Sequence, residues 1–372
     1  MSFTAETYQD RRRRVLAKAK ESADFDALCI TDPVNVRYLT GLTEGCYKLF
    51  LSDDGDLMLV TWMFYDRAKD SCPGLELGLI APPLGDATTE TIKEHKWSRI
   101  AVIERETSLK EWRNWTDRMG DDGVIAISDA VMSCRLIKDE TEVALMTEAV
   151  RIAENAFLEL CGRGRDYFIG KTERELALEL EILMRSNGAE DQSFPNGIIL
   201  ATGANSYGAH YVPALSKVED GHSILMDWGA VVDGYCSDMT RIVAVGDIPE
   251  RIIEMHTAVK QAVAAALAVI KPGVESFDVD AAARQVFLDA GFDAKAFRHG
   301  LGHAIGLEVH EALRFHPDRA QCGIIEAGMV MTVEPGVYLP DIGGVRLEHD
   351  VLVTESGCEV MGELPLDIVR LD

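Results

Sequence analysis

The first 130 residues alternate between helical and strand-like spacing of apolar side chains. Residues 5–22 have the period of an amphipathic helix. Four short apolar runs, at 27–30, 57–60, 78–80 and 100–103, are typical of buried strands. The intervals between these runs are long enough for crossover helices. The pattern therefore predicts an α/β domain that ends near residue 130.

A long amphipathic helix is expected next, over residues 139–161. Its apolar positions recur at steps of three and four residues: Val143, Met146, Val150, Ala153, Phe157 and Leu160. The segment 172–175 reads Thr-Glu-Arg-Glu, the capping-box pattern that begins a helix. Two further helices are expected at 249–269 and 278–290.

The remaining stretches, 195–245 and 297–360, are rich in strand patterns. The first part of the chain alternates short strands and helices, whereas the second part has long helices and separate strand-rich stretches. We therefore place a domain boundary between the two parts. The predicted domains are residues 1–134 and 135–372.

Charge and composition narrow the class of partner. The chain has 62 acidic and 37 basic residues, a formal net charge of −25. Such a surface repels phosphate backbones, so no nucleic-acid partner is expected. No apolar run approaches the roughly 20 residues that span a bilayer, and the first residues lack the apolar core of a signal peptide. We therefore expect a cytoplasmic protein without a membrane partner.

Two further features have plain structural interpretations. The arginine run at 11–14 is predicted to be the exposed face of the first helix. The eight cysteines are scattered and form no C-x-x-C pair, which is typical of reduced structural thiols rather than of a disulfide framework or a zinc ribbon.

Two aspartates lie in apolar runs on either side of a turn signal. The segment 223–246 has two such runs flanking Asp233–Gly234, a strong β-hairpin pattern. The parity of the numbering places Asp227 and Asp238 on one face of that hairpin, opposite each other or one diagonal step apart. Two carboxylates so placed repel each other unless a cation lies between them. The hairpin therefore indicates a metal site.

Three histidines follow in a glycine-rich segment, R-H-G-L-G-H-A-I-G-L-E-V-H-E, which contains His299, His303 and His310. Glycine lets other groups approach closely, and three imidazoles so near one another favour a binding or catalytic site. The spacing of the first two resembles a helical zinc pair. The segment lacks the glutamate of that motif, however, and is a poor helix former.

Two glutamates occupy strand-like segments near the end of the chain. Glu334 ends an apolar run just before Pro335, and Glu348 lies two residues after Arg346, so Arg346 and Glu348 share a face. Each glutamate alone also fits an ordinary surface alternation. A hairpin over 330–353 would bring the two together, as the first hairpin does for the aspartates.

Four carboxylates and at least one imidazole are thus expected on paired strands. Ligands rich in oxygen, with little nitrogen and no sulfur, suit Mn²⁺, Co²⁺, Fe²⁺ or Zn²⁺. Two such ions about 3.5–4 Å apart can activate a shared water and stabilise the oxyanion that forms.

The order of these motifs resembles the creatinase/aminopeptidase P/prolidase branch of the pita-bread metallopeptidases. The motifs are D-x-G, G-Y-x-S-D-x-T-R, H-G-x-G-H-x-x-G-L-x-x-H-E, E-P-G-x-Y and G-x-R-x-E. The resemblance covers nearly the whole chain. It implies a creatinase-type α/β domain over 1–134, which contains N-V-R-Y-L-T-G at 35–41. It also implies a pita-bread α+β catalytic domain over 135–372, with a curved antiparallel sheet and helices on the outer face.

The resemblance implies five metal ligands for two divalent ions, with Mn²⁺ the first expectation and Co²⁺, Zn²⁺ and Fe²⁺ the others. Asp238 and Glu348 would bridge both ions. Asp227 would complete one site, and His303 with Glu334 would complete the other.

It also implies residues that act on the substrate. His210 would lie on the substrate side, although a purely structural histidine fits that position too. His310 would contact the scissile carbonyl or the nitrogen side, and His299 would line the pocket. Arg346 would shape the site and pair with a carboxylate, and Glu334 would double as a general base.

The activity implied is hydrolysis of the bond before proline in dipeptides or short peptides, by a hydroxide that bridges the metals. A homodimer is expected, with the N-terminal domain of one subunit bordering the partner's site. The short N-terminal domain favours a dipeptidase over an aminopeptidase P. His349 stands where relatives often carry an acid or a small polar residue, so the surroundings of Glu348 and the metal preference stay open.

Other functions occur on the same fold. Creatinase lacks the metal ligands, all five of which are present here. Non-catalytic binding proteins of this fold typically lose them as well. A metal-dependent hydrolase or lyase of a non-peptide molecule, such as an ectoine-type hydrolase or a sulfoniopropionate lyase, keeps them and stays the alternative.

Overall fold

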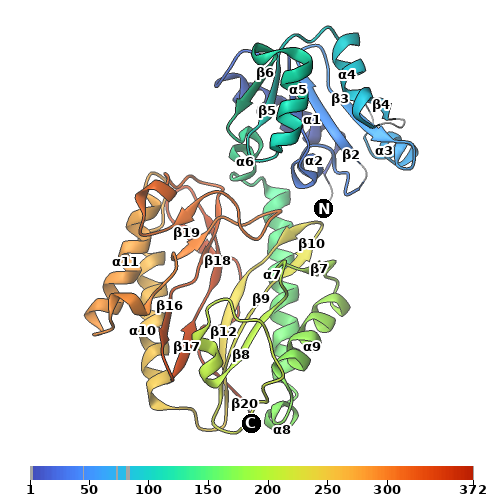
Figure 1. Cartoon of the computed structure of the whole chain (residues 1–372). Coiled ribbons are helices and arrows are strands. Elements are labelled where there is room, and N and C mark those ends of the chain that lie inside the picture. Colours follow the sequence, from blue (N-terminus) through green and yellow to red (C-terminus); the bar gives the residue numbers. More distant parts are fainter. Residues whose placement is uncertain (1–2, 45, 73, 81–83, 372) are drawn as a thin grey trace. The chain divides into compact units, whose positions relative to one another are not determined.

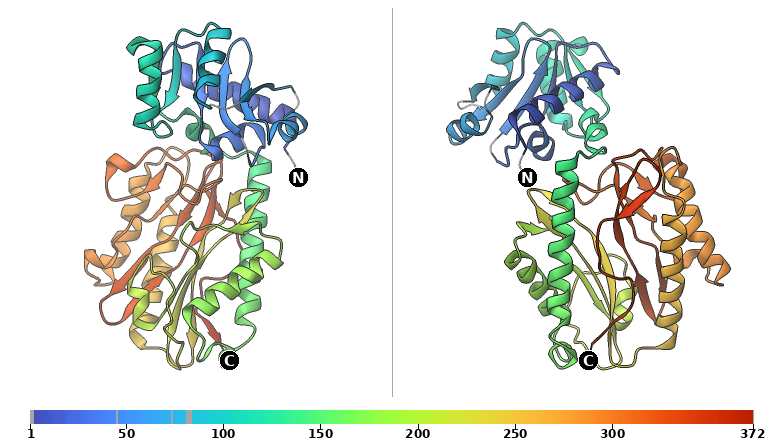
Figure 2. Two further views of the ribbon diagram at one scale, coloured as in Figure 1. Left: turned by 45° about the vertical axis from the view of Figure 1, so that its right-hand side comes forward. Right: turned by 180° about the vertical axis from the view of Figure 1, so that it is seen from behind.

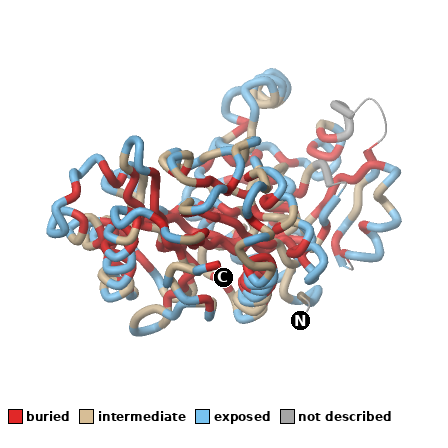
Figure 3. Tube along the Cα trace, turned by 90° about the horizontal axis from the view of Figure 1, so that it is seen from below, coloured by how far each residue is buried: buried red, intermediate tan, exposed pale blue. Residues whose placement is uncertain are grey.

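The computed structural model describes residues 3–44, 46–72, 74–80 and 84–371, and the chain forms two units, Met1–Arg135 and Leu136–Asp372 (Figures 1 and 2). The expected two-domain architecture is therefore present. In both units the buried positions run along the strands, and the outer helices carry the exposed ones (Figure 3). Among the described helices, none combines the length and the apolar content needed to cross a bilayer.

The N-terminal unit is built on a six-stranded mixed sheet of order β4-β3-β2-β1-β5-β6. Its strands are β1 (Ala27–Ile30), β2 (Cys46–Ser52), β3 (Leu57–Thr61), β4 (Glu76–Ile80), β5 (Ile100–Ile103) and β6 (Val124–Ile127). Its helices are α1 (Ala5–Lys20), α2 (Pro33–Thr40), α3 (Tyr65–Ser71), α4 (Leu84–Glu94), α5 (Leu109–Met119) and α6 (Ala130–Arg135). The four predicted strands and the first helix are confirmed.

The prediction of this domain was incomplete, because it missed strands β2 and β6. Strand β2 pairs antiparallel with both β1 and β3, so the chain folds back inside an interval that had seemed free for a crossover helix. Its apolar run is interrupted by Lys48, which hides the strand from a search for continuous hydrophobic segments.

The prediction for the arginine run is wrong for its first half. Arg11 and Arg12 are buried, and only the two arginines after them are exposed. Arg11 donates to the carbonyl of Tyr38 at 3.1 Å and Arg12 to that of Leu39 at 2.9 Å. These carbonyls belong to the last turn of α2, where guanidinium groups satisfy backbone acceptors that the helix itself cannot. Arg12 also pairs with Asp56 at 2.7 Å.

The helices of the second unit begin where their capping residues predict. Helix α7 (Glu140–Cys161) is capped by Asp139 and α9 (Glu173–Ser186) by Thr172, each in a reciprocal capping box. The predicted helices near 249–269 and 278–290 are α10 (Glu250–Leu267) and α11 (Ser276–Asp289), and a short helix α8 (Arg165–Phe168) lies between α7 and α9.

The strands of this unit form several small sheets, in which all pairs are antiparallel except that of β12 with β20. The largest has the order β20-β12-β9-β8, and the others are β11-β10-β7, β15-β18-β19, β16-β17 and β13-β14. The strands are β7 (Asp191–Gln192), β8 (Ile199–Thr202), β9 (Ser223–Trp228), β10 (Ala230–Val232), β11 (Tyr235–Cys236), β12 (Met239–Val245), β13 (Gly302–His303), β14 (Arg314–Phe315), β15 (Val330–Val333), β16 (Gly336–Leu339), β17 (Gly343–Arg346), β18 (His349–Val353), β19 (Cys358–Val360) and β20 (Val369–Leu371).

Helices cover these strands on two sides (Figure 1). Helices α7 and α9 pack on β8, β9 and β12, where the Phe157 and Trp228 rings stack with centroids 4.5 Å apart. Helices α10 and α11 pack on the strands from β15 to β18. The strands therefore form the inside of the unit and the helices its outer faces, as expected, and polar residues among the strands can meet in a protected interior.

Candidate metal centre

The first hairpin has the register that the turn signal predicts. Asp233 and Gly234 have φ values of 46° and 80°, both in the left-handed region that a tight two-residue turn requires. Strand β9 pairs with β12 so that Asp227 faces Thr240. Asp238, two positions before Thr240, therefore lies one diagonal step from Asp227 on the same face, and the predicted placement is confirmed.

The second hairpin brings the two glutamates opposite each other. Val333 pairs with His349, and Gly336 pairs with Arg346 in the same register. Glu334 and Glu348 occupy the break between these two ladders. Pro335 explains the break, since it has no N–H to donate to the partner strand. The backbone at both glutamates therefore lies outside the two ladders, and the two side chains point into the same cavity.

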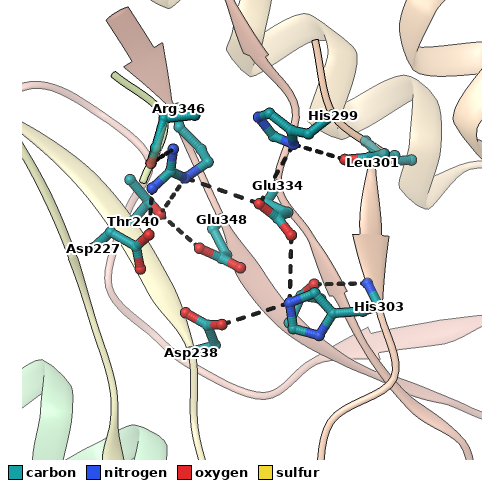
Figure 4. A network of polar contacts seen from close by, with 12 residues as sticks. Asp227, Asp238, Thr240, His299, Leu301, His303, Glu334, Arg346 and Glu348 are labelled. Carbon is teal, nitrogen blue, oxygen red and sulfur yellow. Dashed lines mark hydrogen bonds and ion pairs between the residues drawn. The ribbon is translucent and has the colours of Figure 1, made fainter. Parts of the chain in front are cut away.

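A threonine and an arginine join the two hairpins (Figure 4). The Thr240 hydroxyl donates to Glu348 at 2.6 Å, and the Glu348 N–H donates to the Thr240 carbonyl. The Arg346 guanidinium pairs with Asp227 and donates to the Thr240 hydroxyl, the Tyr338 hydroxyl and the Ala209 carbonyl. Arg346 is fully engaged by these partners, which holds Asp227 in a fixed position.

His303 completes the group from a third segment. It lies on β13 with its ring Nε2 3.4 Å from Glu334 Oε1 and 3.8 Å from Asp238 Oδ2. Atoms of Asp238, His303 and Glu348 lie within 4.8 Å of one another. All five residues of the predicted ligand set line one cavity (Figure 4).

These residues fit a cation. Asp227 Oδ1 and Asp238 Oδ1 are buried and accept no hydrogen bond from the described residues, and a buried charged oxygen without a partner is costly. The donor set is four carboxylates and one imidazole, which suits divalent ions that prefer oxygen and nitrogen. A divalent cation would satisfy both orphaned oxygens.

The pKa shifts of the ligand-type side chains also favour a bound cation. Burial raises the pKa of Asp238 well above its usual range, and the neighbouring carboxylates of Glu348 and Asp227 raise it further. Burial raises the pKa of Glu334 to about 8. Burial also lowers the pKa of His303, so its ring is neutral and has a lone pair for a metal. Repulsion among the carboxylates is the cost that a bound cation would remove.

The three other predicted histidines line the same cavity of about 160 Å³. The His310 ring lies 4.3 Å from that of His303, and burial lowers the pKa of His310. His299 lies between the Gly300 carbonyl and the Tyr338 hydroxyl, at 2.8 and 2.9 Å. His210 is exposed on the loop after β8.

The surroundings of Glu348 show a residue that sequence reasoning missed. Asp350 is buried, and its carboxylate accepts the backbone N–H of Asp238 at 2.9 Å. It lies on the same face of the strand as Glu348, so alternation along β18 could have found it. His349 faces the other way, toward Arg241, with nitrogen atoms 3.4 Å apart. His349, whose position beside Glu348 had left the metal preference open, therefore points away from the site.

A second missed residue organises the loop that carries His210. Glu173, at the first position of α9, is fully buried. Its carboxylate accepts from the Thr202 N–H, the Asn205 amide, the Tyr211 hydroxyl and the Ala214 N–H, at distances of 2.8 to 3.0 Å. The capping box gave the helix start but no sign that Glu173 would anchor a distant loop.

Two family models match the chain. The model of metallopeptidase family M24 matches residues 144–355, and that of the creatinase/prolidase N-terminal domain matches residues 11–137. The expected resemblance is confirmed by both.

Similar proteins span the full length. An Xaa-Pro dipeptidase of Pyrococcus horikoshii is 35% identical over 353 residues, covering 93% of this chain and 95% of that protein. The structure of an Xaa-Pro dipeptidase from Bacillus anthracis superposes with a TM-score of 0.91 at 30% identity, covering 98% and 100% of the two chains. The structure of an X-Pro aminopeptidase from Thermotoga maritima gives 0.85 at 33% identity, covering 93% and 98%.

The family match implies divalent metal ions, and among the described residues the carboxylate-rich cavity has the side chains that fit them. The chain therefore belongs to metallopeptidase family M24.

Proposed function

We propose that this chain is an Xaa-Pro dipeptidase that uses two divalent metal ions. The observation that carries the proposal is the convergence of five ligand-type side chains on the wall of one small cavity. The bond before proline is supported by the names of the similar proteins, which are dipeptidases and aminopeptidases of that specificity.

We assign the metal ligands as follows. On the family resemblance, Asp238 and Glu348 would be shared by both ions, and atoms of both lie within 4.8 Å of His303. Asp227 would complete one site, and His303 with Glu334 would complete the other. We expect Mn²⁺, and Co²⁺, Zn²⁺ and Fe²⁺ suit the same donors. When bound, the ions lower the pKa of a water and draw charge from the scissile carbonyl.

The residues around the ligands have separate tasks. Glu334 reaches the cavity with 17% of its side chain exposed, and we assign it to accept the proton of the attacking water. As the bond breaks, the proline nitrogen leaves as an amine and must be protonated, so a proton donor is required. His310 is assigned that step, in which it would pass on the proton that Glu334 takes from the attacking water. His210 and His299 contact the substrate, and Arg346 keeps Asp227 and the Ala209 carbonyl in place.

The size of the cavity supports a dipeptide substrate. Its volume of about 160 Å³ is below the roughly 300–1,000 Å³ of pockets that hold drug-sized ligands. Its other walls include Phe194, Pro195, Tyr211 and Val212, a largely apolar surface suited to a proline ring.

A paired assay tests the proposal. Metal-stripped protein is reconstituted with Mn²⁺ and given Ala-Pro and Ala-Pro-Ala in parallel. We expect fast release of proline from Ala-Pro and slow cleavage of the longer peptide. Preference for Ala-Pro-Ala would make the enzyme an aminopeptidase P. If neither peptide were cleaved while two metals were bound, the peptidase proposal would be wrong.

Replacing His310 by alanine should keep the metals and remove turnover. The ring lies beside His303 but is outside the proposed ligand set, and loss of a general acid typically lowers kcat by about 10²–10⁴-fold. Metal content measured by elemental analysis, together with kcat on Ala-Pro, separates the two effects. The control is His316→Ala, a histidine that does not line the cavity. Loss of metal in His310→Ala would contradict the assigned role.

We also propose a homodimer, on the model of the family in which a partner's N-terminal domain limits substrate length. Light scattering should give twice the chain mass of 40.9 kDa. A single-chain mass at assay concentration would contradict this prediction, and would leave the dipeptide preference to be explained by the cavity alone.

A reducing cytoplasmic location is the last part of the proposal. The seven cysteines described in detail are free thiols, and Cys46 lies outside that description. Burial raises the pKa of Cys29 and of Cys161 to about 12, so these thiols are unreactive. Recovery of the enzyme in a periplasmic or secreted fraction would contradict this location.

A further inference from the structure

Helix α5 of the N-terminal domain has an apolar side that the fold covers only in part. Trp112, Trp115 and Met119 recur at steps of three and four residues, which places them on one face. All three pack against the hydrophobic core of the domain, yet each stays only partly buried. An amphipathic helix ordinarily buries its apolar face on the sheet beneath it. The incomplete burial here, together with Trp115 and Met119 in the lining of a neighbouring cavity, leaves apolar surface that a ligand could cover.

That space is a cavity of about 630 Å³, lined by residues of the N-terminal domain alone. Its lining side chains come from strands β2 and β4, from helices α4 and α5, and from the turn after α4. Those that matter most are Lys48, Lys93, Lys96, Trp97, Trp115 and Arg118. The volume falls within the roughly 300–1,000 Å³ typical of pockets that bind small molecules.

The two tryptophans that line the cavity differ in how completely they are buried. Trp97 is 7% exposed, and its ring packs against Phe50 at 5.2 Å and stacks on His95 at 4.6 Å. Trp115 is half-buried at the cavity. A flat apolar group placed there could cover the exposed part of the Trp115 ring, which the sheet leaves open.

The charge of the cavity is opposite to that of the chain. Four basic side chains line it against one acid, Glu111, in a chain of net charge −25. The Lys48 ammonium lies 4.7 Å from the Trp115 ring and 3.6 Å from Glu111. Within the described part of the chain, no acidic side chain forms an ion pair with Lys93. An anion that reaches this cavity would therefore meet a locally positive field beside an aromatic surface.

We propose that this cavity binds a small aromatic carboxylate. The ring lies against Trp115 and Ile92, and the carboxylate is directed at Lys48 and Lys93. A cationic or neutral ligand would gain nothing from the four basic groups, and a long peptide would exceed the cavity. This binding function is separate from the peptidase site, because every residue that carries it belongs to the N-terminal domain.

The test titrates the full-length protein with 1-naphthylacetate by calorimetry, and compares the neutral 1-naphthylacetamide. We expect saturable 1:1 binding of the acid, and affinity for the amide lower by about fivefold, the value of one partly exposed ion pair. Equal affinity for both would overturn the assignment of the basic groups, and absence of binding by the acid would overturn the proposal.

Variants locate the binding. Trp115→Ala should abolish it and Lys93→Met should reduce it to the level of the amide, whereas Lys110→Met, an exposed lysine of α5 outside the lining, should leave it unchanged. Because Lys93 is exposed, its replacement does not threaten folding. Asp238→Asn in the catalytic domain should also bind normally. Full binding by both Trp115→Ala and Lys93→Met, or its loss in Asp238→Asn, would place the ligand elsewhere and overturn the proposal.

Discussion

Replacing Asp238 by asparagine should remove nearly all peptidase activity and most of the metal, while both domains remain folded. The carboxylate lies between His303 and the other acids, and its Oδ1 atom is buried with no hydrogen bond from the described residues. Asparagine has nearly the same shape but no charge, and its amide nitrogen cannot ligate a cation. If Asp238 is shared by both ions, as proposed, the substitution should weaken the binding of both at once.

The clearest measurement is thermal stability with and without Mn²⁺. A ligand that binds only the folded state at 100 times its Kd stabilises that state by about 2.7 kcal/mol. We expect this gain in the wild type and almost none in Asp238→Asn. Without metal the variant should be at least as stable as the wild type, because one of several repelling buried carboxylates has gone.

Asp247→Asn is the matched control, since it removes an exposed aspartate from the same domain. It should keep activity, metal and the thermal shift. Should Asp238→Asn retain full metal and turnover, the assigned centre would be wrong. An unfolded variant would also contradict the prediction, because it would show that Asp238 serves the fold itself.

Local rules account for much of what the sequence predicted at this centre. The Asp-Gly turn sets the register of the first hairpin, and the register sets which face Asp227 and Asp238 occupy. A slip of one residue would move them to opposite faces. The pair of glutamates follows from the same logic, because Pro335 interrupts the ladder at a predictable position. Such features depend on a few neighbouring residues, so a single sequence suffices.

The remaining parts depend on contacts between distant segments. Thr240 joins Glu348 across the two hairpins, and Arg346 reaches Asp227 over an interval of 119 residues. Glu173 anchors Tyr211 on the loop of His210. In the sequence, Thr240 looks like an ordinary strand residue and Glu173 like an ordinary helix-capping residue, so neither shows that it will contact a distant segment. Family resemblance could supply Arg346 as a residue of interest, but not the partners that fix its position.

The same limit applies to the first domain. The buried pair Arg11 and Arg12 satisfies carbonyls at the end of α2, an arrangement that exists only once the two helices have packed. From the sequence, four consecutive arginines indicate an exposed face, because burial of a charge without a partner is costly. The partner was backbone, which carries no sequence signal.

Replacing Lys138 by methionine should destabilise the catalytic domain by about 3–5 kcal/mol, the cost of leaving the other member of a buried ion pair behind. The Lys138 ammonium lies 2.8 Å from Glu311, and each side chain is 1% exposed. The surroundings cannot relax easily, since even a methyl group on Gly306 would approach Glu311 Oε1 to 2.7 Å. Hydrogen exchange of α7 peptides across a urea series would measure the loss in this domain alone.

The second variant, Lys138→Met with Glu311→Leu, separates stability from positioning. Replacing both members of a buried pair by apolar residues often restores stability, so we expect most of the loss to be recovered. Glu311 directly follows His310, and its backbone N–H donates to the Ala304 carbonyl at 2.7 Å. The pair could also fix the position of the His310 ring. In that case kcat on Ala-Pro should be low in the double variant, even though its fold is stable and its metals are bound. Recovery of kcat together with stability would show that the ion pair serves only the fold, and that the backbone bond alone positions the histidine.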